Sequence, residues 1–315
     1  MFQNKKTKIA IAGMGGIGGY IGGKLAHYYA DQDLIDIIFI TRGETLKQIE
    51  QSGLELTSKE VHYRTIPTMV SNDPDEIGTI DLLIICTKTF STNELLVEYQ
   101  KCLSSKTTVI TLQNTINGKE RITPILPEGA SLMEGCIYIA SNKTAPNKVL
   151  HSSGPATVFF GTDKVLNPQG AAIAKLLNYA GIEAHYTRDI TTLLWKKFLF
   201  VSPAAIVTAL HQITFTEILE SRETEYLYIH LMSELMELGK AQKIFIDPLT
   251  VLNNIQLLSK FKGSVKSSFQ IDLEQHRPTE IYSLVAYPIE QGQEFDLVMP
   301  YYQKAWVDLQ SKYNL

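Results

Sequence analysis

A run of glycines directly after a short apolar segment constrains the fold more than any other part of the sequence. Lys8–Ala12 has the character of a strand, and Ile17–Tyr29 has the spacing of a helix. The turn between them, Gly13-Met14-Gly15-Gly16-Ile17-Gly18, fits the pattern G-x-G-x-x-G in the required strand–turn–helix context. We therefore expect a dinucleotide-binding turn whose contacts come from Gly13, Gly15, Gly16, Ile17 and Gly18. The alternative is a turn that is merely tight.

The rest of the first half alternates between strand-like and helical spacing, which predicts βαβ units and a parallel sheet. The expected strands are Ile35–Ile40, Ile80–Cys86, Thr108–Leu112, Leu132–Ala140, Lys148–Ser152, Thr157–Phe160 and Ile182–Tyr186. Helices are expected at Thr92–Cys102 and Pro168–Ala180. The predicted fold is an α/β, Rossmann-type doubly wound parallel sheet followed by an all-helical C-terminal domain.

From Arg188 onward the strand signals vanish and long stretches with 3.6-residue spacing follow. Helices are expected at Thr191–Leu210, Ser221–Lys240 and Pro248–Lys260, with a further one starting at Arg277-Pro278. We therefore predict a dinucleotide-binding domain over residues 1–187 and an all-helical domain over residues 188–315.

Composition excludes several classes of protein. The chain has 315 residues, 44% of them apolar, and its 29 Lys+Arg against 33 Asp+Glu argue against nucleic-acid or membrane-surface binding. The N-terminus, MFQNKKTK, leaves no room for a secretory apolar region before the first strand, and the three cysteines form no CxxC pair. We expect a cytoplasmic protein without a bound metal, since the seven histidines show no H-x-x-x-H pair.

The residue at the end of the second expected strand bears on which dinucleotide is bound. Enzymes that bind NAD usually carry Asp or Glu there, but this chain has Ile40-Thr41-Arg42. A guanidinium suits the 2′-phosphate of NADP, so Arg42 favours NADPH as the cofactor. The alternative is an exposed loop arginine.

Two polar residues follow later strands of the expected sheet. Lys88 comes after Ile84-Ile85-Cys86-Thr87, and Asn114 after Ile110-Thr111-Leu112-Gln113. Ligands of open parallel sheets bind outside the carboxyl ends of the strands, so both are candidates for contact with cofactor or substrate. Both are also compatible with ordinary solvated loops.

A lysine falls within the apolar stripe of the helix expected at Thr191–Leu210. Lys197 follows Leu194 by three residues and precedes Val201 by four, whereas Lys196 points away. An amine on such a face is a candidate proton donor; alternatively, it extends to the domain edge. Pro203 should kink the same helix.

Two further polar sites are ambiguous from spacing. Glu280 would lie in the first turn of the helix after Pro278, where a carboxylate is favoured by the helix dipole. One hydroxyl of Ser267 and Ser268 could bind a substrate carboxylate or cap a helix.

Taken in order, six motifs resemble the 2-dehydropantoate 2-reductase (ketopantoate reductase) family over nearly the whole chain. They are GMGGIG, CTKTF around Lys88, LQN at Asn114, LLWKKF at Lys197, SSF at Ser268 and PTEI at Glu280. The resemblance implies NADPH-dependent reduction of 2-dehydropantoate to (R)-pantoate, on the route to pantothenate and coenzyme A. Lys197 then corresponds to the catalytic lysine and Glu280 to the active-site glutamate. Asn114 and Ser268 correspond to substrate-binding positions, and Arg42, Lys88 and Asn114 to positions near the cofactor.

The sequence also departs from this family. Val201 and Ala205 stand where the family usually has asparagines, and Ile281–Ala286 lacks the usual I-D-x-x-N-G run. Reduction of a different 2-oxo acid is therefore an alternative, and a non-catalytic NADPH-binding sensor is another. The last helices, with Phe295 and Trp306, complete the core or form the seam of a homodimer.

Overall fold

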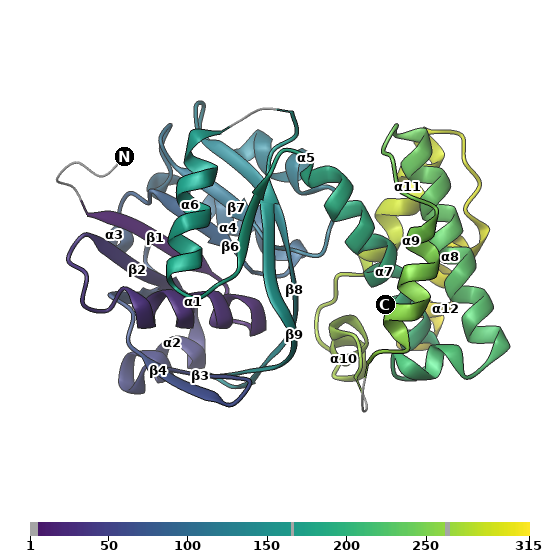
Figure 1. Ribbon diagram of the computed structural model, residues 1–315, viewed down its shortest axis with the longest axis horizontal. Helices are drawn as coiled ribbons and strands as arrows, with labels where there is room; N and C mark the ends of the chain where they lie inside the picture. Colours follow the sequence, from purple (N-terminus) through teal and green to yellow (C-terminus); the bar gives the residue numbers. More distant parts are fainter. Residues whose placement is uncertain (1–5, 165–166, 262–264) are drawn as a thin grey trace. The chain divides into compact units, whose positions relative to one another are not determined.

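The computed structural model describes residues 6–164, 167–261 and 265–315, and it divides into two compact units (Figure 1). The first unit comprises Met1–Gln113 and Asn117–Ile190, and the second Asn114–Ile116 and Thr191–Leu315. Residues 1–5, which include part of the N-terminal segment considered above, lie outside the described residues. Asn114 thus packs with the helical unit although it follows a strand of the first.

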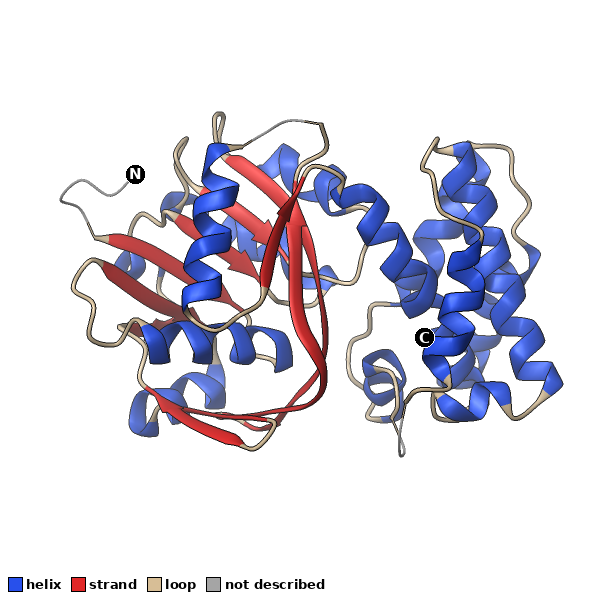
Figure 2. Ribbon diagram, viewed as in Figure 1, coloured by secondary structure: helices blue, strands red, loops and turns tan. Residues whose placement is uncertain are grey.

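The first unit is built on a sheet that has ten strands in the described residues (Figure 2). Their order in space is β4 (Val61–Thr65), β3 (Leu54–Ser58), β9 (Lys148–Gly161), β8 (Ser131–Ala145), β7 (Thr108–Thr111), β6 (Leu82–Ile85), β1 (Thr7–Ala12), β2 (Ile35–Ile40) and β5 (Met69–Ser71), with β10 (Ala184–Thr187) paired to β9. All neighbours from β8 to β5 in this order are parallel, whereas β8–β9 and β3–β4 are antiparallel. The Rossmann-type prediction is confirmed, and a mixed extension enlarges the sheet beyond β8.

Helices cover both faces of the parallel part of the sheet. Ile9 and Ile11 of β1 contribute to one apolar core, together with α1 (Gly16–Tyr28) and α6 (Pro168–Tyr179). Ala10 and Ala12 contribute to a second core on the opposite face. That face is covered by α3 (Pro74–Ile77), α4 (Thr92–Glu98) and α5 (Gly118–Ile122), while α2 (Gly43–Ser52) follows β2. Because both faces of these strands are buried, their sequences are almost continuously apolar.

Two features of the extension differ from the expectations. The strands expected at Lys148–Ser152 and Thr157–Phe160 form one strand, β9, which continues through Gly154 at φ +87° and shifts register against β8. A glycine can adopt this conformation within an irregular ladder, so it bends the strand instead of ending it. Strands β3, β4 and β5 were not predicted; their runs are only five, five and three residues long.

The second unit consists of helices joined by loops, and its described residues contain no strand. It contains α7 (Ile190–His211), α8 (Arg222–Ala241), α9 (Leu249–Leu258), α10 (Ser268–Glu274), α11 (Tyr287–Glu294) and α12 (Pro300–Tyr313). In the described part of the chain, α7 alone is long and apolar enough to span a membrane, but 67% of its apolar window is buried in the protein. Trp195 and Leu199 of α7 belong to the apolar core that the helices share, so α7 packs into the interior of this unit.

Candidate active site

Two glycines of the turn after β1 are required by the folding of the turn itself. Gly13 has φ +92°, and a Cβ there would lie 2.8 Å from the Thr87 backbone nitrogen. A Cβ on Gly18 would overlap the carbonyl oxygen of Gly13. Larger residues at either position would therefore push α1 away from the sheet.

Gly15 and Gly16 have different surroundings. A Cβ on Gly15 would meet no atom within 4 Å, and Gly15 caps α1 without a side-chain hydrogen bond or an acidic residue in the first turn. Gly16 instead abuts the backbone of Ser141 on β8, whose hydroxyl donates to the Gly16 carbonyl at 2.9 Å. The free space over Gly15 and the N–H groups of the first turn fit a diphosphate. Ser141 lies 125 residues away and no local signal revealed it.

Arg42 lies where the sequence placed it, at the carboxyl end of β2 and the start of α2. Its guanidinium forms ion pairs with Glu98 and, at 3.9 Å, with Glu94, both on α4. The basic side chain predicted to read a 2′-phosphate is therefore engaged by two carboxylates of its own unit.

Hydrogen bonds from Gln113 link the segment after β7 to the segment after β6, beside the glycine turn. Lys88 is partly buried and precedes a 3₁₀ turn, η1 (Thr89–Ser91). Gln113 donates from Nε2 to the Thr87 carbonyl at 2.8 Å and to the Thr92 hydroxyl at 2.7 Å. Gln113 therefore fixes the loop that carries Lys88, a role that sequence reasoning missed.

The Cys86 thiol lies at the end of β6. Burial raises its pKa to about 12, so the thiol stays protonated at neutral pH.

The second unit brings together Lys197 and Asn114. Lys197 lies near the middle of α7, and its Nζ donates to Asn114 Oδ1 at 2.6 Å, in a partly buried setting. The two residues are 83 positions apart. While Oδ1 accepts from the amine, the Nδ2 donors of Asn114 can serve another group. The amine is thus held in one place by a polar partner, which the apolar stripe of α7 did not predict.

Glu280 is buried, with 7% of its surface exposed, but the helix expected from Pro278 begins later, at Ile281. The Glu280 carbonyl accepts the first helical hydrogen bond, from the Leu284 N–H at 3.0 Å. Glu280 therefore lies at the cap rather than in the first turn. A π-helical turn, η5 (Tyr282–Ala286), follows, and Ser202 of α7 donates to the Leu284 carbonyl at 2.7 Å. Such turns often accompany functional sites.

Helix α7 continues through Pro203 to His211.

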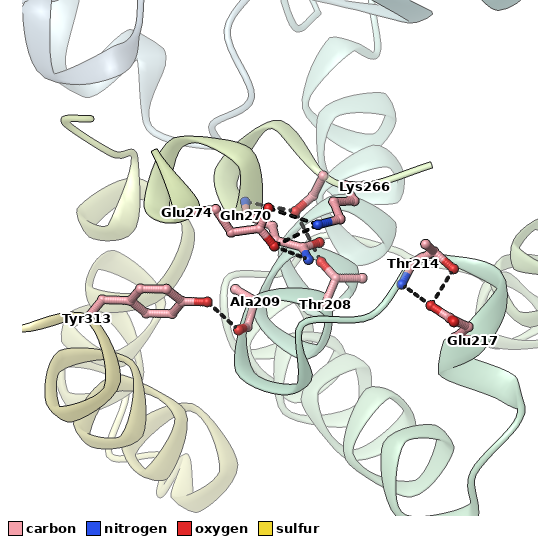
Figure 3. Close-up of polar contacts among 9 residues, drawn as sticks. Thr208, Ala209, Thr214, Glu217, Lys266, Gln270, Glu274 and Tyr313 are labelled. Atoms are coloured by element: carbon pink, nitrogen blue, oxygen red, sulfur yellow. Dashed lines mark hydrogen bonds and ion pairs between the residues drawn. The ribbon is translucent and has the colours of Figure 1, made fainter. Parts of the chain in front are cut away.

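The paired serines divide their roles. Ser267 is buried, accepts from the Gln270 N–H at 3.1 Å as the cap of α10, and contacts the Thr208 hydroxyl of α7 at 3.1 Å. Ser268 is exposed at the first position of α10. Figure 3 shows the surrounding network, in which Glu274 accepts from Lys266 and Gln270. The Lys266 ammonium lowers the pKa of Glu274. Ser267 is thus structural, and Ser268 is left as the candidate for substrate.

Two family models match this chain and together cover most of it. The model described as "Ketopantoate reductase PanE/ApbA" matches residues 9–164, and the one described as "Ketopantoate reductase PanE/ApbA C terminal" matches residues 189–312. The chain belongs to the ketopantoate reductase family. It is therefore an oxidoreductase that uses a nicotinamide cofactor.

Individual relatives of this family member are distant but similar over their full length. "Uncharacterized oxidoreductase YkpB" of Bacillus subtilis is 23% identical over 96% of this chain and 98% of its own. The crystal structure of 2-dehydropantoate 2-reductase from Porphyromonas gingivalis has a TM-score of 0.83 and 27% identity, covering 97% and 99% of the two chains. A ternary structure of D-mandelate dehydrogenase with NADH and anilino(oxo)acetate has a TM-score of 0.85 at 18% identity, covering 98% and 99%.

Proposed function

We propose that this protein reduces 2-dehydropantoate to (R)-pantoate with NADPH, and that it supplies pantothenate and coenzyme A biosynthesis in the cytoplasm. The observation that carries the proposal is the hydrogen bond between Lys197 and Asn114. It joins an amine of α7 to an amide outside the helical segment, at two positions where the sequence carries motifs of the family. A lysine with a purely structural role would not need a partly buried amide partner that offers further donors.

The first unit supplies the residues that would hold the cofactor. The first-turn N–H groups of α1 and the space over Gly15 receive the diphosphate, and Gly13, Gly16, Ile17 and Gly18 shape that turn. Arg42 and Lys88 are the basic residues for its phosphates. When bound, the reduced nicotinamide supplies the hydride for the C2 carbonyl of the substrate.

The second unit supplies the proton. The Lys197 ammonium polarises the carbonyl oxygen, which gains negative charge as hydride arrives at C2, and then donates a proton to it. Asn114 holds the amine and directs its own Nδ2 group to the substrate carboxylate. Glu280 accepts from the substrate hydroxyl, and the exposed Ser268 hydroxyl contributes a further hydrogen bond to the substrate.

A different 2-oxo acid is the second candidate substrate. Val201 and Phe200 follow Lys197 by four and three residues, so they extend the same face of α7 with apolar surface. Phe200 stacks on Phe261 with centroids 5.9 Å apart and meets Phe215 edge-on at 5.8 Å. Such a wall favours an acid with a larger apolar side chain, and the structural neighbour D-mandelate dehydrogenase was crystallised with an aromatic oxo acid.

The test is a steady-state assay of NADPH oxidation with 2-dehydropantoate, run beside 3-methyl-2-oxobutanoate and phenylglyoxylate, and repeated with NADH. We expect the highest kcat/KM for 2-dehydropantoate with NADPH. A preference of about tenfold or more for another acid would establish the second candidate instead. The absence of turnover on every 2-oxo acid would refute the proposed reaction.

A further inference from the structure

Two carboxylates that the cofactor proposal does not use lie beside Arg42 at the carboxyl end of β2. Arg42 caps α2 there, and Glu98 and Glu94 face it from α4. We propose that Glu98 is a cofactor-specificity residue, which competes with the 2′-phosphate of NADPH for the Arg42 guanidinium and thereby makes NADH an accepted cofactor. This inference rests on the proposed binding of a nicotinamide dinucleotide to the first unit.

Both carboxylates come from one face of α4. Glu94 and Glu98 are four residues apart, so their side chains project in the same direction. Glu98 makes the close ion pair, and its side chain is 33% exposed, whereas Glu94 is 74% exposed and 3.9 Å from Arg42. Glu98 is therefore the principal competitor, and Glu94 adds a weaker negative charge beside it.

Tyr99 also holds the guanidinium in this position. The Arg42 side chain hydrogen-bonds to Tyr99, and the Tyr99 hydroxyl donates to the Asn72 carbonyl at 3.1 Å. Burial raises the pKa of Tyr99 to about 12, so the hydroxyl remains protonated and can accept from Arg42 while donating to Asn72. Arg42 is thus an exposed arginine between β2 and α2, as the alternative drawn from sequence has it, and it is paired with two acidic side chains.

The ion pair borders an open hollow at the surface of the first unit. Arg42, Asn93, Glu94, Val97 and Glu98 line an open hollow of about 560 Å³. In folds of this type, the residue at the end of the second strand meets the adenosine ribose, and Arg42 occupies that position. The acidic pair therefore borders the site where the 2′ group of the cofactor is read.

The two cofactors would meet this pair differently. A 2′-phosphate carries about −1.5 to −2 charges near neutral pH, so it must displace Glu98 from the guanidinium and approach Glu94 as a like charge. A 2′-hydroxyl carries no charge and can donate to a carboxylate that remains paired with Arg42. The arrangement consequently lowers the advantage that Arg42 alone would give to NADPH.

The test measures binding, not turnover. Dissociation constants of 2′,5′-ADP and 5′-ADP are determined by calorimetry for the full chain and for Glu98→Gln, which keeps the shape of the side chain and removes its charge. We expect Glu98→Gln to tighten 2′,5′-ADP on the order of fivefold, the upper scale for an exposed ion pair, and to leave 5′-ADP unchanged or weaker. Glu94→Gln is the matched control and should give a smaller gain, because its contact is longer.

A second pair of variants keeps the inference falsifiable. In an Arg42→Ala background the gain from Glu98→Gln should shrink, because the competition needs the guanidinium. Equal changes for both nucleotides, or no change for either, would overturn the role of Glu98. If instead the selective gain appears while 2-dehydropantoate is not turned over, Glu98 keeps this role and the proposed substrate fails.

Discussion

The glycine turn of the first unit and the amine site of the second are built in opposite ways. The turn uses backbone groups from six consecutive residues, Gly13 to Gly18, and side chains matter there mainly because they are absent. The amine site uses side chains from distant parts of the chain, since Lys197 and Asn114 are 83 residues apart. Backbone amides at a helix start bind phosphate wherever the turn forms, whereas a positioned amine needs the whole unit to fold.

Substitutions at the two sites should therefore have different effects. A side chain added in the turn would occupy space: at Gly15 the open space proposed for a ligand, and at Gly18 the space that the Gly13 carbonyl already fills. Under the proposed function, a substitution of Lys197 would remove the group that donates the proton to the substrate.

The largest effect is expected for Lys197→Ala. Loss of the proton donor should lower kcat for 2-oxo acid reduction by about a hundredfold or more, the usual scale for general acid catalysis. Binding of NADPH, measured by fluorescence, should not change, because the glycine turn belongs to the other unit. Lys196→Ala is the control and should retain near wild-type kcat. Similar losses for both lysines would show that the helix surface, and not this amine, is responsible.

Gly15→Ala and Gly18→Ala should separate cofactor binding from folding. Alanine at Gly15 meets no protein atom and its backbone is extended, so the melting temperature should be unaffected while affinity for NADPH falls by about tenfold, or 1.4 kcal/mol. Alanine at Gly18 would overlap the Gly13 carbonyl, so it should cost about 1–3 kcal/mol of stability. Calorimetry and thermal unfolding measure the two effects. Unchanged NADPH affinity in Gly15→Ala would mean that the diphosphate lies elsewhere.

The smallest effect is expected at the paired serines. Ser267→Ala removes the cap of α10 and the contact with Thr208, so it should lower stability by about 1 kcal/mol in chemical unfolding. Ser268→Ala should leave stability unchanged and raise the KM for the oxo acid severalfold, because its hydroxyl is exposed. A higher KM in Ser267→Ala together with a lower stability in Ser268→Ala would show that the two serines have the opposite roles.

Local patterns predicted the elements whose burial is regular. The parallel strands β1, β2, β6 and β7 and the helices α1, α6, α7 and α8 lie within a few residues of their predicted ranges. Prediction was poorer where glycine or proline permits two outcomes. Gly154 bends β9 without ending it, and Pro278 precedes its helix by three residues. Which outcome occurs depends on the neighbouring strand or helix, and a local pattern does not contain that neighbour.

The sequence by itself determined the glycine turn between β1 and α1, the alternation that makes a parallel sheet, and the helical character of the second half. These follow from periodicity and from glycines whose spacing is local. Tertiary structure alone decided that Asn114 accepts from Lys197, that Ser267 and not Ser268 caps α10, and that Arg42 is paired with Glu98. Each of these contacts joins side chains from different elements, so it exists only after packing has set the distances between them.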